Sequence, residues 1–204
     1  MSDSTVRDRI SERLAAASVQ PDPLVLAGLE GYLGLLARWN AKINLTALPV
    51  QPPTDAALDK LLIEPLVAAP FFPASAEAWI DLGSGGGSPA LPLRLACRQG
   101  SLVLVESRER KCAFLREAIR ALGLEQTAVT NARFDALQTA SPVDVVTVRA
   151  VRIDAEMEAL LSGILRVGGL LFCFGTPLES ASYSVSHEAD LPDGSQLTVA
   201  ARLR

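Results

Sequence analysis

"AWIDLGSGGGSPALPL", residues Ala78–Leu93, joins a short apolar run to a second apolar pattern through a bend that is rich in glycine. The first run has the length of a buried strand. Three alternating glycines let the backbone turn sharply and approach a ligand closely: Gly83, Gly85 and Gly87. Ser88-Pro89 resembles a helix N-cap followed by proline in the first helical turn. The stretch therefore predicts a strand, a ligand-binding bend and a helix, with a tight turn that holds no ligand as the alternative.

From Ala78 onward, apolar runs of strand length alternate with helical patterns. The runs are AWIDL, LVLVE, AVTN, VDVVTV and LLFCF, and the helical segments lie near Pro89–Cys97, Glu109–Leu122 and Asp154–Val167. Gly168-Gly169 reads as the stop of the third helix, and Ser182–Val185 with Leu197–Ala200 reads as a terminal hairpin. This alternation predicts an α/β fold with a mostly parallel sheet and crossover helices.

The N-terminal third of the chain has a different pattern. Leucines recur at spacings of three and four in Leu26, Leu29, Leu33 and Leu36, and Thr54 reads as the N-cap of a further helix. We therefore expect an N-terminal helical cap at residues 1–70 and an α/β domain at residues 71–204. A length of 204 residues suits one main domain with such an appendage.

The spacing around the bend restricts the ligand. A dinucleotide fingerprint would need a third glycine where this chain has Ser88, and no Walker A motif is present. Glu106 ends the next strand, nineteen positions beyond Gly87, where an acid can accept hydrogen bonds from ribose hydroxyls. Asp81 adds a second carboxylate near the same crevice. Two acids favour a ligand with hydroxyl, ammonium or sulfonium groups over one dominated by phosphates.

Charge is distributed unevenly. The net charge is −4, yet the segment Arg94–Arg120 carries +4 and the remainder −8. Such a segment is either a solvated helix face or part of a surface for a polyanion. One histidine and three widely spaced cysteines predict no metal site and reduced thiols within the core.

The sequence also indicates the cellular location and the oligomeric state of the protein. No apolar run has the length of a membrane span, and the residues at the start of the sequence mix acids and bases without a secretory h-region. We therefore expect a cytoplasmic protein without a membrane partner. No heptad or long apolar edge is present, which predicts a monomer.

Several segments together resemble one family. WNAKINLTAL (Trp39–Leu48), the glycine stretch, LVESRERKCAFLREAIRALGL (Leu104–Leu124), ARFDAL (Ala132–Leu137) and VDVVTVRAV (Val143–Val151) are similar, in order and spacing, to the RsmG (GidB) methyltransferases. The resemblance implies a Rossmann-like class I methyltransferase fold with an N-terminal helical cap. It also implies S-adenosyl-L-methionine as cofactor and N7 of a guanine in 16S ribosomal RNA as the methyl acceptor.

The resemblance assigns roles to individual positions. It implies that Gly83 and Ser88 lie against the methionine and ribose parts of the cofactor, that Glu106 contacts the ribose, and that Phe134-Asp135 lies beside the adenine. Arg149 falls on the arginine of the Ser-Arg-Ala motif and is the predicted active-site residue, which could hold the base edge or a phosphate. The basic residues expected to follow the RNA backbone of the small ribosomal subunit are Arg108, Arg110, Lys111 and Arg116.

The substrate side departs from the family pattern. Leu61 replaces a histidine, Glu64-Pro65 replaces Asp-Ser, Val148 replaces the motif serine, and Phe174 stands near a position where lysine is common. Three interpretations follow: a ribosomal RNA methyltransferase of this family, a related methyltransferase on another RNA or small molecule, and a non-catalytic binding module.

Overall fold

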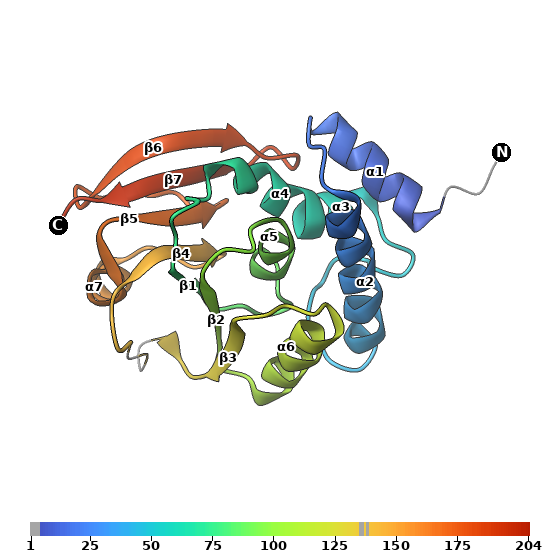
Figure 1. Ribbon diagram of the computed structural model, residues 1–204, viewed down its shortest axis with the longest axis horizontal. Coiled ribbons are helices and arrows are strands. Elements are labelled where there is room, and N and C mark those ends of the chain that lie inside the picture. Colours follow the sequence, from blue (N-terminus) through green and yellow to red (C-terminus); the bar gives the residue numbers. More distant parts are fainter. Residues whose placement is uncertain (1–4, 135–136, 138) are drawn as a thin grey trace.

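The computed structural model describes residues 5–134, 137 and 139–204. Within these residues, seven strands form one sheet in the order β3-β2-β1-β4-β5-β7-β6 (Figure 1). The strands are β1 (Ala78–Leu82), β2 (Ser101–Glu106), β3 (Thr127–Asn131), β4 (Val143–Arg149), β5 (Leu165–Phe174), β6 (Tyr183–Asp190) and β7 (Gln196–Arg202). β1 to β5 pair in parallel, whereas β7 runs antiparallel to both β5 and β6. The predicted α/β fold with a mostly parallel sheet and a terminal hairpin is confirmed.

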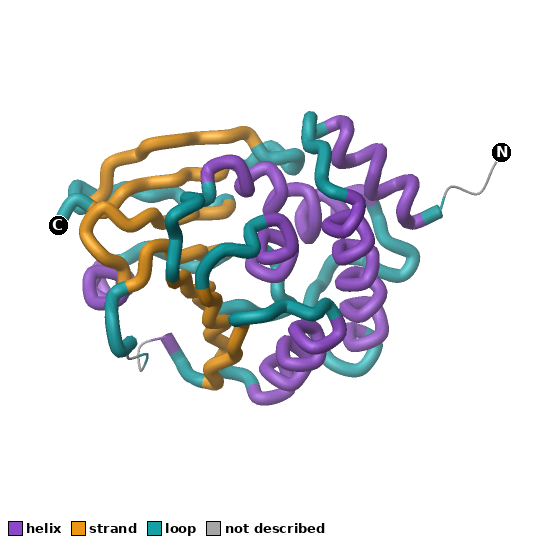
Figure 2. Tube along the Cα trace, viewed as in Figure 1, coloured by secondary structure: helices purple, strands orange, loops and turns teal. Residues whose placement is uncertain are grey.

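The helices surround this sheet unequally. They are α1 (Val6–Ala16), α2 (Pro23–Asn40), α3 (Asp55–Leu58), the π-helix η1 (Asp59–Ile63), α4 (Glu64–Ala68), the 3-10 helix η2 (Ala69–Phe71), α5 (Ala90–Ala96), α6 (Glu109–Ala121) and α7 (Ala155–Ile164). Figure 2 shows most of them gathered on one side of the sheet, with α7 on the other. Side-chain caps begin several helices, and Thr54 caps α3 as predicted by accepting from the backbone N–H of Ala57.

Strand residues alternate between the two faces. On β1, Trp79 packs with the helices α1 to α6, while Ile80 and Leu82 pack with α7. By the same alternation, Asp81 lies on the face covered by α1 to α6. The alternation therefore determines which polar strand residues lie on the same face of the sheet, behind the glycine-rich bend.

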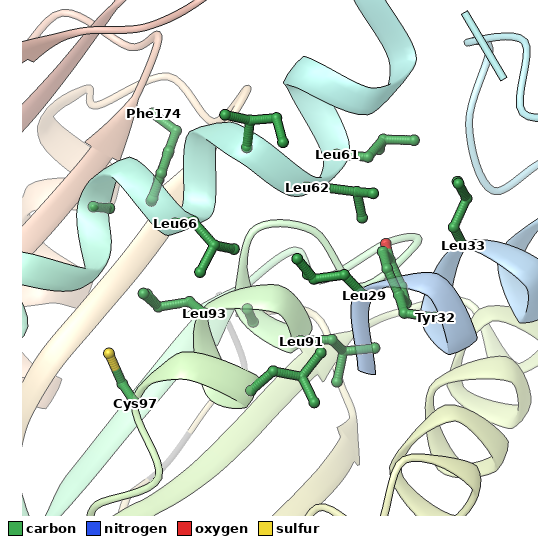
Figure 3. Packing of buried hydrophobic residues seen from close by; sticks show 14 of the residues in the cluster. Leu29, Tyr32, Leu33, Leu61, Leu62, Leu66, Leu91, Leu93, Cys97 and Phe174 are labelled. Carbon is green, nitrogen blue, oxygen red and sulfur yellow. The ribbon is translucent and has the colours of Figure 1, made fainter. Parts of the chain in front are cut away.

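The cap helices and the sheet share one hydrophobic core. Leu29 and Leu33 of α2, labelled in Figure 3, belong to the same buried cluster as Leu62, Leu66 and Leu91. Burial of this many apolar side chains is the main stabilising contribution, at about 25 cal/mol per Å². The helices of residues 1–70 therefore pack against the face of the sheet on which the glycine-rich bend lies.

Two predicted boundaries are wrong. Ser88 does not cap a helix, because α5 begins at Ala90 without a side-chain cap and the Ser88 hydroxyl donates to the carbonyl of Leu61. Gly168-Gly169 does not stop a helix either, because α7 ends at Ile164 and the glycine pair lies within β5, beside an irregular pairing with β4. A glycine pair suits a strand irregularity as well as a helix end.

Two further findings concern the cysteine side chains and the hydrophobicity of the helices. The three cysteines, Cys97, Cys112 and Cys173, are buried and free, as predicted. No helix in the described part of the chain is long and apolar enough to cross a membrane.

Candidate cofactor and substrate site

The glycine-rich bend lies at the carboxyl ends of β1 and β2. The backbone N–H groups of Gly83 and Ser84 donate to the Val105 carbonyl, at 2.9 and 3.0 Å. Gly83, Gly85 and Gly87 have φ angles of +74°, +52° and +88°, which other residues rarely adopt. At Gly87 a Cβ atom would lie 2.4 Å from Leu91 Cδ1, so a side chain there would collide with α5. The predicted bend is confirmed as a left-handed glycine loop.

Glu106 holds this loop in place. One carboxylate oxygen accepts from the backbone N–H of Gly85 at 2.9 Å, and the other accepts from that of Arg108 at 2.8 Å. The side chain is nearly buried and also lines a pocket at the end of β2. A carboxylate has about four acceptor positions, so Glu106 can accept from a ligand hydroxyl while it keeps both backbone contacts.

Asp81 is a buried carboxylate behind the loop. It pairs with Thr147 across β1 and β4, and its Oδ1 accepts from the Thr147 hydroxyl at 2.5 Å. Its Oδ2 is buried and has no hydrogen-bond partner among the described residues. Burial raises the pKa of Asp81 to about 6, although the Thr147 hydroxyl acts in the opposite direction.

A pocket of about 310 Å³ opens beside Glu106. Its lining combines the loop, the end of β2 and the segment after β3: Gly83, Val105, Glu106, Ser107, Arg108, Lys111, Ala132, Arg133 and Phe134. Of the predicted cofactor residues, Gly83, Glu106 and Phe134 line it directly. Gly85, Gly87 and Ser88 shape the loop, Asp81 lies behind it, and Asp135 falls outside the described residues.

The residues present fit a nucleoside ligand such as S-adenosyl-L-methionine. Glu106 lies in the pocket wall, where it could accept from a ribose, and Phe134 provides an aromatic surface for a base. A Cβ atom added to Gly83 would lie 3.8 Å from Val151 Cγ2, so the glycine leaves room between the loop and Val151. The unpartnered Asp81 Oδ2 is a further acceptor close to the loop.

Arg149, the predicted active-site residue, ends β4 and is largely enclosed. Its Nη1 donates to the Lys60 carbonyl at 2.6 Å and to Ser88 Oγ at 2.9 Å, and its Nη2 donates to Glu64 Oε2 at 2.8 Å. Direct contact of Arg149 with a substrate stays a prediction. Its donated hydrogen bonds indicate that it positions the loop.

Two open hollows continue from the first pocket along the carboxyl edge of the sheet. The nearer measures about 300 Å³ and shares Phe134 with the pocket beside Glu106, and the farther measures about 480 Å³. Both include Arg152, which is exposed, and Ala150, whose φ is +55°. A left-handed residue that is not glycine is sparse and often marks a functional turn.

Tyr32 also contacts the glycine loop, although the sequence patterns did not indicate it. It lies on α2, fully buried among leucines (Figure 3), and its hydroxyl donates to the Gly86 carbonyl at 2.6 Å. The available signal was a tyrosine on the apolar face of the leucine-rich helix, where a buried hydroxyl needs a partner.

The basic segment divides between surface and interior. Arg108 and Lys111 line the pocket beside Glu106, Arg110 is exposed, and Arg116 pairs with Glu109 at 3.4 Å. Arg94 is instead buried and donates to backbone carbonyls at the opposite edge of the sheet, so its charge does not contribute to a surface. Within the described residues, no group of three or more His, Cys, Asp and Glu side chains could hold a metal ion.

The strand order, the antiparallel β7 and the glycine loop beside an acid at the end of β2 define the class I methyltransferase fold. The ribosomal protein L11 methylase of Lactobacillus delbrueckii subsp. bulgaricus has the same fold, with a TM-score of 0.57 and 12% identity over 69% of this chain and 77% of that chain. The GidB family, rRNA small subunit methyltransferase G, matches residues 26–185.

Relatives in that family extend over most of the chain. The ribosomal RNA small subunit methyltransferase G of Stenotrophomonas maltophilia is 39% identical over 89% of this chain and 81% of its own length. The protein of the same name from Halorhodospira halophila is 36% identical over 92% of this chain and 84% of its own length. The chain belongs to the GidB family, as its sequence motifs predict.

Proposed function

We propose that this protein transfers a methyl group from S-adenosyl-L-methionine to N7 of a guanine in 16S ribosomal RNA. The observation that carries the proposal is the GidB family match over a chain whose glycine loop, Glu106 and pocket are arranged for a nucleoside cofactor. The names of the relatives supply the RNA class.

The cofactor side uses residues that are already in place. Gly83 and Glu106 would hold the ribose end, Phe134 would cover the adenine, and Asp81 would add an acceptor near the loop. When bound, S-adenosyl-L-methionine would supply a sulfonium methyl group to the guanine N7 lone pair, with S-adenosylhomocysteine as the leaving group. Because N7 is unprotonated, the protein's task is alignment and exclusion of water, without a strong general base.

The substrate would enter along the hollows beyond Phe134. Arg152 is exposed there and can donate to a phosphate or to the edge of a base. Ala150 and Val151 would form the floor between cofactor and base. Arg149, held by Ser88 and Glu64, would support this surface from behind.

A basic strip would follow the RNA backbone from the pocket along α6. It comprises Arg108, Arg110, Lys111 and Arg116. Reversing Arg110 to Glu is expected to weaken RNA binding and to lower the slope of log K against log salt by about 0.7–0.9 for each cation removed. Arg98→Glu is the matched control, because Arg98 is an exposed cation of the same segment at the opposite edge of the sheet. Equal loss in both variants would reject the strip.

Titration calorimetry tests the cofactor assignment. The wild type is expected to bind S-adenosyl-L-methionine and S-adenosylhomocysteine with micromolar affinity. Glu106→Ala should abolish this binding, because it removes the ribose acceptor and releases the Gly85 N–H. A folded wild type that binds neither ligand would overturn the proposal. We also propose a monomer in the cytoplasm, and light scattering after size exclusion tests the monomer.

A further inference from the structure

The guanidinium of Arg149 joins three segments that are far apart in the sequence. It contacts the π-helix η1 through the Lys60 carbonyl, the glycine loop through Ser88 Oγ and the start of α4 through Glu64, at 2.6, 2.9 and 2.8 Å. The ring of Phe174 lies beneath it, 4.8 Å from the central carbon to the ring centroid. The Arg149 side chain is only 12% exposed, so it is enclosed mainly by these neighbouring residues.

Local backbone geometry supplies two of the acceptors in this cluster. In η1 the Glu64 N–H donates to the Asp59 carbonyl, five residues earlier, instead of to the Lys60 carbonyl. Pro65 has no N–H to donate to the Leu61 carbonyl, four residues earlier. The Lys60 carbonyl accepts from Arg149 instead, and the Leu61 carbonyl accepts from the Ser88 hydroxyl at 2.9 Å.

Glu64 provides the opposing charge. Its side chain is 0% exposed, and Oε2 also lies 3.3 Å from Lys60 Nζ, which in turn pairs with Asp193 at 2.7 Å. A buried guanidinium without a carboxylate would be strongly destabilised. Glu64 therefore determines where the Arg149 side chain can lie.

Ser88 connects this cluster to the cofactor side. It closes the glycine loop, which Glu106 holds at Gly85 and Tyr32 holds at Gly86. The hydroxyl of Ser88 accepts from Arg149 and donates to Leu61, so it attaches the closing end of the loop to η1.

We infer that Glu64 is a positioning residue for the cofactor loop: through Arg149 it fixes Ser88 and so holds the loop in its binding conformation. The inference rests on the proposed function, since it assumes that this loop binds S-adenosyl-L-methionine. Glu64 contacts Arg149 and Lys60 and does not line the pocket beside Glu106 or the hollows beyond Phe134, so its effect on cofactor affinity would pass through Arg149.

A double-mutant cycle on cofactor affinity tests the inference. The variants are Glu64→Gln, Ser88→Ala and the pair, with S-adenosylhomocysteine affinity measured by calorimetry and folding checked by thermal unfolding. Each single variant is expected to lose about tenfold in affinity, while Glu64→Gln adds less than about twofold in the Ser88→Ala background, because coupled residues are not additive. Independent, multiplying losses, or wild-type affinity in Glu64→Gln, would overturn the inference.

Asp59→Asn is the matched control. Asp59 is another nearly buried carboxylate of η1, but its partner is Arg13 of α1, at 2.7 and 2.5 Å, and it does not contact the loop through its side chain. This variant should lose stability and keep its affinity within about twofold. Equal affinity losses in Asp59→Asn and Glu64→Gln would show a general structural effect and overturn the inference.

One further variant keeps the test informative if Glu64→Gln fails to fold. Glu64→Asp keeps the charge but shortens the side chain that accepts from Arg149 Nη2, so it should bind S-adenosylhomocysteine more weakly than wild type in a folded protein. Wild-type affinity in this variant would contradict the inference. A wild type that binds no S-adenosylhomocysteine would overturn the proposed function as well, whereas normal wild-type binding with unaffected variants overturns this inference alone.

Discussion

Tyr32→Phe is expected to destabilise the protein and weaken its binding of S-adenosylhomocysteine. The ring of Tyr32 is fully buried in the α2 core and would remain, so the change removes only the 2.6 Å hydrogen bond to the Gly86 carbonyl. Losing one such bond and leaving its acceptor unpaired costs about 1–2 kcal/mol. For a chain of this length, that loss lowers the melting temperature by about 2–8 °C. Urea unfolding at pH 7 and calorimetry with S-adenosylhomocysteine measure the two effects.

The second tyrosine of the chain provides an internal control. The Tyr183 hydroxyl is buried, and no hydrogen-bond partner for it exists among the residues that the structure describes. Tyr183→Phe should therefore leave stability unchanged or raise it, because the variant removes a buried polar group without a partner. Equal stability of Tyr32→Phe and wild type, or an equal loss in both variants, would refute the assignment of Tyr32 to the glycine loop.

Three other variants test separate parts of the account. Burial raises the pKa of Asp81 to about 6, so the folded protein keeps a proton that the unfolded chain releases near pH 4. The stability that this proton contributes is present below pH 4 and is lost as the pH rises through 6. Asp81→Asn should therefore show a smaller fall in melting temperature between pH 4 and pH 8 than wild type, and parallel pH profiles of the two proteins would contradict this. Gly87→Ala, at φ +88° and in collision with Leu91, should lose about 1–3 kcal/mol in urea unfolding together with cofactor affinity, and wild-type affinity would argue against the loop geometry. Arg94→Met should lose about 2–4 kcal/mol by leaving backbone carbonyls unpaired, yet bind S-adenosylhomocysteine normally because Arg94 lies at the opposite edge of the sheet, and reduced affinity would contradict that separation.

Most of the fold could be predicted because local patterns report it directly. Continuous apolar runs, helical spacing and the Thr54 cap correspond to the strands and helices that form. The errors lie where one signal serves two structures. Gly168-Gly169 suits a helix stop and a strand irregularity equally, and Ser88-Pro89 reads as a cap although its hydroxyl is taken by Leu61.

The candidate site could be predicted from the sequence only where its residues lie close together along the chain. The glycine loop and Glu106 follow from spacing along β1 and β2, but Thr147 becomes a partner of Asp81 only once β4 is known to pair with β1. Tyr32 likewise meets the loop through tertiary packing across 54 positions.

Two of the departures from the family pattern meet at one residue. Taken one by one, Glu64 and Phe174 read as departures on the substrate side, and Ser88 reads as part of the cofactor loop. In the folded chain all three contact Arg149, from three different elements. Ser88 and Glu64 lie 61 and 85 positions from Arg149, so no pattern along the sequence could reveal this cluster.

The most direct test of the central claim is methyl transfer itself. Small ribosomal subunits and free 16S ribosomal RNA that lack the modification would be incubated with the protein and methyl-labelled S-adenosyl-L-methionine, and the product treated with borohydride and aniline, which cleave RNA at N7-methylguanosine. We expect label in the RNA, cleavage at one guanine, and loss of both with Glu106→Ala. A folded protein that binds the cofactor but transfers no label to either RNA, or that labels an atom other than guanine N7, would contradict it.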